Sequence, residues 1–314
     1  MAGPAVSVII PTHNRIPLLQ EALDSVHAQT FRDYEVIVVD DGSDSPIEPL
    51  IADHPTRPRV FRQPSRRGPA AARNRGIREA VADTVAFLDS DDLWLANKLE
   101  RFVDALSSRQ GPQIYYGPMQ PVDFRGRVVP GRTKPCHRGH ITEQLFCSSF
   151  VHVPAVVCRK SLLVRMGGFD ETLPVCEDYD LWLRLSVEEP FGLLDEPLAK
   201  RRLHSNRLSK TDMSRNLAVK AEVLRRFYES TRTNGHLDPA VAMRRLARAW
   251  YVAGRAAFRG HRFGRACEMC QTSRSYGAAW GRTVPLGWAS RAFVYFFGNG
   301  DGDIPEAPPE IVST

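Results

Sequence analysis

The chain has 314 residues, of which 43% are apolar and 25% charged, and a formal net charge of +6, as is ordinary for a soluble globular enzyme with one large domain and a smaller one. No window approaches ~18 uninterrupted apolar residues, and the short N-terminal apolar run lacks a charged leader, so neither a transmembrane span nor a signal peptide is expected. Six thinly spread cysteines argue against a disulfide framework and indicate reduced thiols in a cytosolic protein.

Positive charge is concentrated in the last third of the chain. Residues 215–294 hold 15 Lys and Arg against 4 Asp and Glu, whereas the final twenty residues hold four acids and no base. The basic character therefore belongs to one region, which indicates modules with different partners. We expect a main domain over residues 1–214, a basic helical module over 215–295 and a disordered acidic tail over 296–314.

Strand and helix signals alternate through the first two-thirds of the chain. Continuous apolar, β-branched runs predict buried strands, and apolar residues at helical spacing predict helices between them. In chain order, the predicted elements are a strand over 6–12, a helix over 17–29, a strand over 34–43, a helix over 67–83, a strand over 85–88 and a helix over 93–106. This alternation is typical of an α/β fold with a mostly parallel sheet flanked by helices, in which ligands bind beyond the C-terminal strand ends.

The signals weaken after residue 110. Segments 113–119 and 150–160 have strand character, residues 120–145 predict a polar loop region, and residues 176–189 predict a helix. From about residue 215 the pattern is helical, and segment 242–266 has an apolar face and a separate face of arginines.

Three carboxylates follow the strand predicted over 85–88, in the run "VAFLDSDDLW". Asp89, Asp91 and Asp92 repel one another, and buried carboxylates are costly unless they are paired, hydrogen-bonded or metal-bound. Mg²⁺ or Mn²⁺ resolves this repulsion, since either ion binds one or two carboxylates and completes its shell with substrate phosphates. The alternative is a solvated turn. In either case we expect Asp91 or Asp92 to cap the helix predicted from Leu93.

Two further segments carry polar groups suited to a phosphate-containing ligand. Asp40 and Asp41 end the second predicted strand, where Asp-Gly is a strong turn pair and where a carboxylate can also accept a hydrogen bond from a nucleobase or ribose. Arg73 and Arg75, in "ARNRG", offer guanidinium groups that match phosphate geometry. Surface solubility is the alternative for either arginine, and we favour it for Arg75.

The helix predicted over 176–189 begins with three acids, Glu177, Asp178 and Asp180. Acids favour helix N-termini through the macrodipole, but a carboxylate that faces a cleft can also act as a general base. Segment 200–209 concentrates arginines and His204, and it fits a loop that closes over a diphosphate, with His204 as metal ligand or phosphate donor. A lone histidine is more often structural.

Together these segments resemble glycosyltransferase family 2, the inverting nucleotide-sugar transferases with the GT-A fold. The matches, in family order, are "SVIIPTHNR", "YEVIVVDDGS", "AAARNRGI", "VAFLDSDDLW", "GGFDETL", "EDYDLWLRL" and "RLHSNRLS". They extend from residue 6 to about residue 210, roughly two-thirds of the chain. The region after 215 lies outside the family core.

The resemblance implies donor-binding roles near the N-terminus. Pro11, Thr12 and Asp40 would contact the nucleoside, with Asp40 near the base. Arg73 would lie beside the ribose or the diphosphate.

The resemblance also implies the chemical centre. Asp89 and Asp91 fit the family's D-x-D pair, which holds Mn²⁺ or Mg²⁺ and the donor diphosphate. Asp178, in the "ED" pair, would be the catalytic base, and His204 matches a late donor-site histidine whose role varies among members. The implied reaction moves a sugar from a nucleoside-diphosphate sugar, a UDP-sugar in the first instance, to a hydroxyl of a glycan or glycolipid acceptor, as in polysaccharide biosynthesis.

Two other functions stay open. One is a catalytically degenerate nucleotide-sugar-binding protein, against which the intact carboxylates argue. The other is a nucleotidyltransferase, which normally needs a glycine-rich phosphate loop where this chain has "PTHNR". The basic helical module is interpreted as a helical cap or homodimer surface, or as a peripheral contact with the inner face of a membrane. No nucleic-acid partner is expected, because no recognised motif accompanies the charge.

Overall fold

The structure is a computed structural model, and it describes residues 3–108, 110–130, 134–203 and 212–278. The chain divides into two compact units, Met1–Arg207 and Leu208–Thr314, here called the α/β unit and the helical unit. The acidic tail predicted over 296–314 lies outside the described residues.

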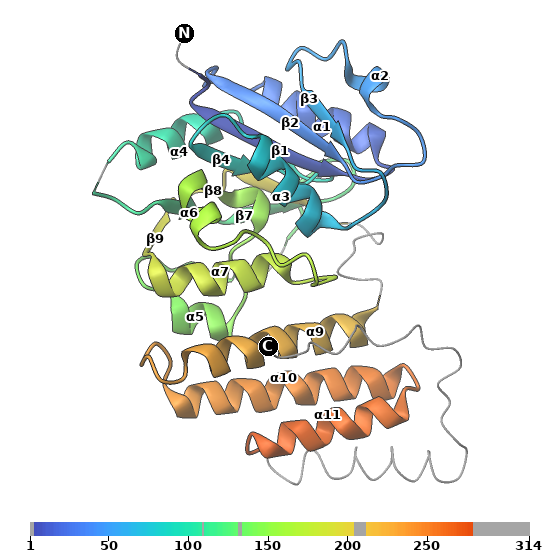
Figure 1. The fold of residues 1–314 in the computed structure, drawn as a ribbon, viewed down its shortest axis with the longest axis vertical. Coiled ribbons are helices and arrows are strands. Elements are labelled where there is room, and N and C mark those ends of the chain that lie inside the picture. Colours follow the sequence, from blue (N-terminus) through green and yellow to red (C-terminus); the bar gives the residue numbers. More distant parts are fainter. Residues whose placement is uncertain (1–2, 109, 131–133, 204–211, 279–314) are drawn as a thin grey trace. The chain divides into compact units, whose positions relative to one another are not determined.

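A seven-stranded sheet in the order β3-β2-β1-β4-β8-β6-β9 forms the centre of the α/β unit (Figure 1). Only β8 runs against its neighbours in this sheet, and the other pairs are parallel. The strands are β1 (Val6–Thr12), β2 (Tyr34–Asp40), β3 (Arg59–Arg62), β4 (Thr84–Phe87), β6 (Ile114–Tyr116), β8 (Val156–Arg159) and β9 (Phe191–Leu193). The predicted fold class, a mostly parallel sheet flanked by helices, is confirmed.

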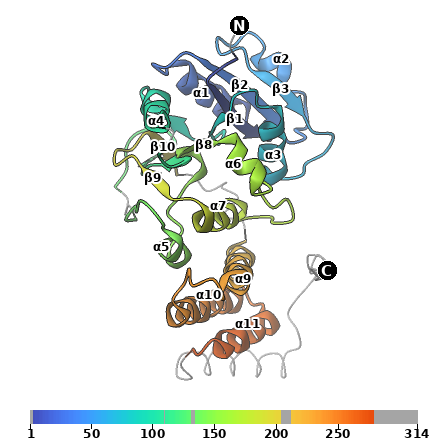
Figure 2. The same ribbon diagram turned by 60° about the vertical axis from the view of Figure 1, so that its left-hand side comes forward.

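Helices cover both faces of this sheet (Figures 1 and 2). They are α1 (Ile16–His27), α2 (Glu48–Ile51), α3 (Pro69–Glu79), α4 (Lys98–Leu106), α5 (Thr142–Cys147), α6 (Lys160–Arg165) and α7 (Glu177–Glu188), with a 3-10 turn at Val153–Ala155. Side chains alternate across the strands, so Val8 and Ile10 of β1 share a buried cluster with Leu19 of α1 and Phe102 of α4. On the other face, Ile9 meets α3.

Helix α3 lies against β1 so closely that position 76 excludes a side chain. A Cβ atom on Gly76 would stand 2.3 Å from Cγ2 of Ile9, which is inside any ordinary contact distance. The third residue before Gly76 on the same helix is Arg73, which is buried. The close approach of helix and strand therefore fixes where this arginine lies.

The helix predicted over 93–106 begins later than expected. Residues Leu93–Trp94 form β5, which pairs with β10 (Ala199–Arg202) in a second sheet of order β5-β10-β7, completed by β7 (Met119–Val122). The buried indole of Trp94 donates a hydrogen bond from Nε1 to the carbonyl oxygen of Pro154 at 3.0 Å. Strand pairing and burial of this ring override the helical pattern, and α4 begins only at Lys98.

Lys98 carries an amino group into the core at the start of α4. The residue is fully buried, and among the described residues its Nζ atom has no hydrogen-bond partner. Nζ lies 4.0 Å from the ring centroid of Phe102 and 5.0 Å from that of Trp94. Burial lowers the pKa of Lys98 well below its ordinary value, because an ammonium ion is poorly solvated there.

The helical unit contains α9 (Met213–Thr231), α10 (Pro239–Arg259) and α11 (Phe263–Ser275), and α10 packs against both of the others (Figure 2). Asp212 and Asp238 cap α9 and α10 by accepting hydrogen bonds from backbone N–H groups of the first turn. The apolar face predicted for 242–266 supplies buried contacts, among them Leu246 and Ala253. Within the described ranges, no helix combines the length and apolar character needed to cross a bilayer.

Candidate active site

The acidic residues predicted at strand ends gather at the carboxyl edge of the large sheet. Asp89 and Asp91 follow β4, and Thr12 and Asp40 end the adjacent strands β1 and β2, where they are register partners. The run Asp89, Asp91 and Asp92 is compact, since one carboxylate oxygen from each lies within 4.8 Å of the others. Parallel strands thus bring several predicted residues to one edge, as the fold class requires.

Arg73 joins this edge to α7. Its Nη2 atom donates to Oδ1 of Asp89 at 2.7 Å, and its Nη1 atom donates to Oε1 of Glu177 at 2.6 Å. The guanidinium also lies 5.4 Å from the ring centroid of Phe169. Charge from both carboxylates raises the pKa of Arg73 despite its burial, so the group stays cationic. One buried cation therefore connects the predicted D-x-D pair with the predicted E-D pair.

Asp178 lies beside this bridge at the start of α7. The residue before the helix, Cys176, has a left-handed backbone with φ of 66°, which sets the entry into the first turn. Asp178 is partly buried, and within the described part of the chain its carboxylate accepts one hydrogen bond, from its neighbour Tyr179 N at 2.7 Å. Burial, and next the charge of Glu177, raise the pKa of Asp178 to about 6. A carboxyl with this pKa is suited to general-base catalysis near neutral pH.

The third acid of the first turn of α7 has a different environment. Oδ2 of Asp180 accepts from Nε of Arg184 at 2.8 Å, one helical turn further on. Asp180 is thereby part of an ordinary i,i+4 ion pair.

Asp91 is paired with an arginine that the sequence reasoning did not single out. Nη1 of Arg15, which precedes α1, donates to Oδ2 of Asp91 at 2.7 Å. Arg15 is the last residue of "PTHNR", directly after β1. Its position beside an acid-rich strand end could have predicted its pairing with an aspartate. Arg15 and Arg73 therefore each hold one acid of the D-x-D pair.

Asp92 has a structural role, and the expectation that Asp91 or Asp92 caps a helix at Leu93 is wrong. Oδ1 of Asp92 accepts a hydrogen bond from the backbone N–H of Arg202 at 2.9 Å, so Asp92 fastens β10 to the acidic edge. The helix starts only after Asn97, whose side chain makes no capping hydrogen bond. The cause is the pairing of β5, which places Leu93 in a strand.

In the described part of the chain, each of the two strand ends next to the acids has a buried polar atom that makes no hydrogen bond. Pro11 and Thr12 are buried in β1, and the Thr12 hydroxyl has no hydrogen-bond partner among the described residues. Oδ1 of Asp40 accepts from Ser43 N at 2.9 Å, whereas its buried Oδ2 has no hydrogen bond and stands 3.5 Å from Nη1 of Arg62. Such atoms are suited to a polar ligand, because an unmatched buried polar group is costly.

Asp41, the neighbour of Asp40, is instead occupied by the protein backbone. Its carboxylate accepts hydrogen bonds from Arg67 N at 2.7 Å and Gly68 N at 2.9 Å, and from the side chain of Gln63 at 3.0 Å. Asp41 thus holds the turn that leads into α3. Asp41 is therefore structural, whereas Asp40 keeps one oxygen that accepts no hydrogen bond among the described residues.

The basic segment predicted as a closing loop is in part a strand. Arg202 lies in β10, buried, with its guanidinium paired to Glu21. His204 lies outside the described residues.

The acidic cluster fits a hard divalent cation. Asp89 and Asp91 offer carboxylate oxygens, the ligands that Mg²⁺ and Mn²⁺ prefer, at a mutual spacing compatible with one ion. Arg15 contacts one oxygen of Asp91, and Arg73 contacts one oxygen of Asp89. The donor chemistry of the cluster therefore agrees with the metal predicted from the sequence.

Comparison with known proteins supports this interpretation of the fold. Residues 7–146 match the family model described as Glycosyl transferase family 2. An uncharacterized glycosyltransferase of Rickettsia felis is 29% identical over 220 residues, covering 68% of this chain and 36% of the relative. A pre-mycofactocin glycosyltransferase of Mycobacterium tuberculosis is 35% identical over 219 residues, covering 63% and 43%. The chain spans about a third of the length of the first curated relatives that it matches.

Solved structures agree with the architecture. S. aureus TarS 1–349, solved in complex with UDP-GlcNAc, superposes with a TM-score of 0.61 at 18% identity over 92% of this chain and 91% of that one. The mannosyltransferase PcManGT of Pyrobaculum calidifontis, solved with GDP-Man and Mn²⁺, gives a TM-score of 0.57 at 20% identity, covering 95% and 82%.

The sheet order, the acidic carboxyl edge and these superpositions define a GT-A fold of the glycosyltransferase type. Residues 7–146 belong to glycosyl transferase family 2, by the family model that matches them.

Proposed function

We propose that the chain is an inverting glycosyltransferase that moves a sugar from a nucleoside-diphosphate sugar to an acceptor hydroxyl. The observation that carries this proposal is the Arg73 bridge, which joins Asp89 of the D-x-D pair to Glu177, the neighbour of Asp178. This bridge supports a metal–diphosphate site at Asp89 and Asp91 that lies close to a carboxylate of raised pKa, as an in-line displacement requires.

The donor would lie along the carboxyl ends of β1, β2 and β4. Thr12 Oγ1 and Asp40 Oδ2, which make no hydrogen bond among the described residues, would meet the nucleoside, with Pro11 beside them. Arg73 would stand near the ribose or diphosphate, and His204 is proposed as a further donor contact. A UDP-sugar is the first candidate, and TarS, a structural neighbour, was solved with UDP-GlcNAc.

Asp178 is proposed as the general base. Its carboxylate takes the proton of the acceptor hydroxyl while the hydroxyl oxygen forms a bond to the anomeric carbon. The bond from that carbon to the donor diphosphate breaks, and the electron pair leaves with the nucleoside diphosphate. Attack opposite the leaving group converts an α-linked donor into a β-linked product.

Mn²⁺ or Mg²⁺, held by Asp91 and Asp89, would supply positive charge for the departing diphosphate. Two arginines of this chain orient these ligands, since Arg73 holds one carboxylate oxygen of Asp89 and Arg15 holds one of Asp91. PcManGT, a neighbour in fold, was solved with GDP-Man and Mn²⁺.

Asp178→Asn tests the catalytic assignment. The amide cannot accept the proton, so turnover should fall by about 10²–10⁴-fold while nucleotide-sugar binding persists. Transfer or hydrolysis is measured over a panel of nucleotide sugars with Mn²⁺, and binding is measured by the thermal shift of the same protein. Asp180→Asn is the matched control, because Asp180 lies in the same turn but pairs with Arg184. Normal turnover of Asp178→Asn would show that the base is another group.

The same panel separates the alternatives. A degenerate nucleotide-sugar-binding protein would bind a donor without hydrolysis or transfer, and a nucleotidyltransferase would join a sugar phosphate to a nucleotide. Asp91→Ala should abolish metal-dependent turnover, and retention of that turnover would remove the metal from the mechanism.

The remaining proposals concern the setting of the reaction. We propose a glycan or glycolipid acceptor, and a cytoplasmic protein that contacts the inner face of a membrane or forms a homodimer through the helical unit. The exposed arginines of α10 support an anionic partner for that unit. Vesicle co-sedimentation with and without residues 215–314 tests this contact.

A further inference from the structure

Three exposed apolar side chains gather at one end of the β5-β10-β7 sheet. Phe124, Val128 and Leu203 have exposed fractions of 62%, 61% and 41%, and we call them the hairpin patch. Their backbones are adjacent, because Val122 forms a β-bridge with Val128 and its carbonyl accepts from Leu203 N at 2.8 Å. Exposed apolar residues are normal when scattered, but a contiguous group marks a contact surface.

The turn that presents Phe124 is held in one conformation. Oδ1 of Asp123 accepts hydrogen bonds from Arg125 N and Arg127 N, both at 2.9 Å, and Oδ2 accepts from Nε of Arg127 at 2.8 Å. Gly126 takes the left-handed conformation, with φ of 76°, that closes the turn. The exposure of Phe124 is therefore a property of an ordered hairpin.

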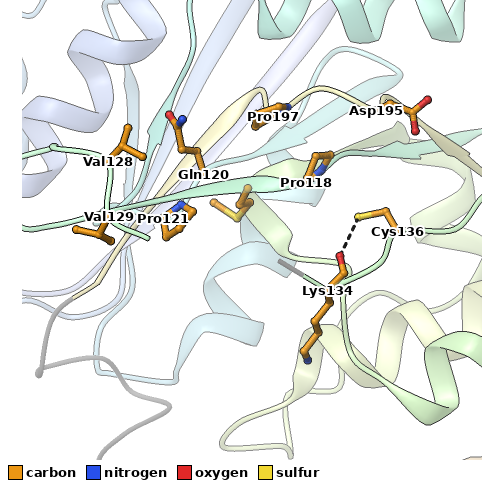
Figure 3. A pocket seen from close by; sticks show the side chains of 10 residues that line it. Pro118, Gln120, Pro121, Val128, Val129, Lys134, Cys136, Asp195 and Pro197 are labelled. Carbon is orange, nitrogen blue, oxygen red and sulfur yellow. Dashed lines mark hydrogen bonds between the residues drawn. The ribbon is translucent and has the colours of Figure 1, made fainter. Parts of the chain in front are cut away.

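An apolar hollow continues the patch. A pocket of about 470 Å³ shares Val128 with the patch and extends along β7. Its walls are mainly proline and aliphatic side chains, among them Pro118, Pro121, Val129 and Pro197. Figure 3 shows Val128 and Val129 at one end of this pocket and Cys136 and Asp195 at the other.

Positive charge flanks the apolar groups. Arg125 and Arg127 are exposed on either side of Gly126, and within the described residues Arg125 forms no ion pair. Arg127 pairs with Asp123 of its own turn, at 2.7 Å. Asp195, at the far end of the pocket, is neutralised by Arg138 at 2.6 Å. The tip thus combines an aromatic ring, aliphatic groups and a cation.

The patch borders the candidate active site. The backbone N–H of Arg202 binds Asp92 of the acidic run, and the next residue is Leu203 of the patch. The guanidinium of Arg202 also lies 5.8 Å from the ring centroid of Phe124. A surface that touches the patch therefore lies next to the acidic edge.

We propose that the hairpin patch is a membrane-contact surface that docks the α/β unit on anionic lipid. Phe124, Val128 and Leu203 enter the interfacial layer, and Arg125 meets lipid phosphates. Lipid fits exposed apolar side chains with a cation beside them, because a fluid interface accepts apolar groups without a shaped partner. The role in catalysis rests on the proposed function: the acceptor reaches the site from the lipid surface, on a lipid anchor.

The test compares vesicle binding of the full chain and its variants. The protein should co-sediment with vesicles of phosphatidylcholine and phosphatidylglycerol. The double change Phe124→Ser and Val128→Ser should weaken this binding about tenfold or more, because it removes apolar area from the contact. Val81→Ser with Val164→Ser is the control, since these valines are exposed by 63% and 61% away from the patch. Arg125→Gln should weaken binding to the mixed vesicles and leave the weaker binding to pure phosphatidylcholine unchanged.

Three outcomes would overturn the proposal. They are equal binding by the patch variant and the parent, an equal loss in the control variant, and no binding of the parent to either vesicle. If the parent binds no vesicles but self-associates, and the patch variant does not self-associate, the patch is a contact between copies of the chain. Sedimentation velocity measures this self-association.

Donor binding in the same preparations separates this proposal from the proposed function. The thermal shift by a nucleotide sugar with Mn²⁺ should be the same in parent and patch variant, because neither changed residue belongs to the acidic edge. A parent that binds vesicles but no nucleotide sugar would leave the membrane contact in place and remove the transferase.

Discussion

The two units use arginine in opposite ways. In the α/β unit, Arg73 is buried and pairs with Asp89 and Glu177. In the helical unit, α10 has no acidic residue, and four of its arginines are exposed without an ion pair among the described residues. These four are Arg244, Arg248, Arg255 and Arg259.

The difference shows what each charge is available to do. A buried guanidinium between two carboxylates is committed to the fold and fixes the geometry of its partners. The exposed arginines recur at spacings of four, seven and four residues, so they form one stripe along α10. Their charge contributes little to folding and remains available to an anionic partner.

The largest expected effect on stability comes from removing the buried cation. Arg73→Met leaves the buried Glu177 and the partly buried Asp89 without this partner, so the free energy of unfolding should fall by about 3–5 kcal/mol. Urea unfolding of the full chain measures this change. Arg75→Met is the control, because Arg75 lies on the same helix and its pair with Glu79 is partly exposed. Equal losses in the two variants would mean that Arg73 is no more committed to the fold than a surface arginine.

Lys98 sharpens the comparison, since its amino group is buried and has neither a hydrogen-bond partner nor a carboxylate partner among the described residues. Lys98→Met keeps the buried length of the side chain and removes the amine, so the free energy of unfolding should rise by about 1–2 kcal/mol at neutral pH. Burial depresses the pKa of Lys98 in the folded state, so the parent gains stability as pH rises from that lowered pKa towards 10.5. The advantage of the variant should shrink over the same range in unfolding curves.

Lys160→Met is the contrasting change. Nζ of Lys160 donates to the carbonyl oxygen of Ala80 at 2.7 Å, so this substitution should lower stability, by about 1 kcal/mol. A stabilised Lys160→Met variant, or a destabilised Lys98→Met variant, would contradict the account of the unpartnered amine.

A smaller effect is expected from protonation of Asp178. Because its pKa is raised to about 6, the base is ionised above that pH and protonated below it, so kcat/KM should be about tenfold lower at pH 5 than on the plateau. Initial rates across the pH range measure this. Glu177→Gln removes the charge that helps to raise the pKa of Asp178, so the acidic limb should move to lower pH. An unmoved limb would assign it to another group.

The smallest effect is expected from the helical unit. Changing Arg244, Arg248, Arg255 and Arg259 of α10 to glutamine should alter the free energy of unfolding by no more than about 0.5 kcal/mol per residue. Thermal unfolding of the quadruple variant is the measurement. A loss of unfolding free energy as large as that of Arg73→Met would show that the exposed arginines of α10 contribute as much to folding as the buried Arg73.

The sequence predicted those features that depend on local pattern. The buried run at Val6–Thr12, the alternation of strands and helices, and the helix at Glu177–Glu188 all follow from apolar periodicity. Parallel topology then requires the acidic strand ends to share one edge, so Asp40 and Asp89 could be placed there in advance.

Features that depend on distant pairing were not predictable in this way. Leu93 and Trp94 left the helical pattern because β10, over a hundred residues later, pairs with them. The ion pairs of Arg15 with Asp91 and of Arg73 with Glu177 likewise join distant segments, and the spacing of apolar residues does not predict them. The burial of Lys98 contradicts the usual preference of lysine for solvent.

Gly76 ties interlayer spacing to the chemistry of the edge. Any side chain there would push α3 away from Ile9, and a rigid helix transmits such a push along its length. Arg73 would move with it, and both carboxylates that it holds would lose their alignment. The glycine of "ARNRG" therefore sets the distance between α3 and β1. Its replacement would impair the acidic edge by displacing Arg73, although position 76 itself contacts none of the acidic groups.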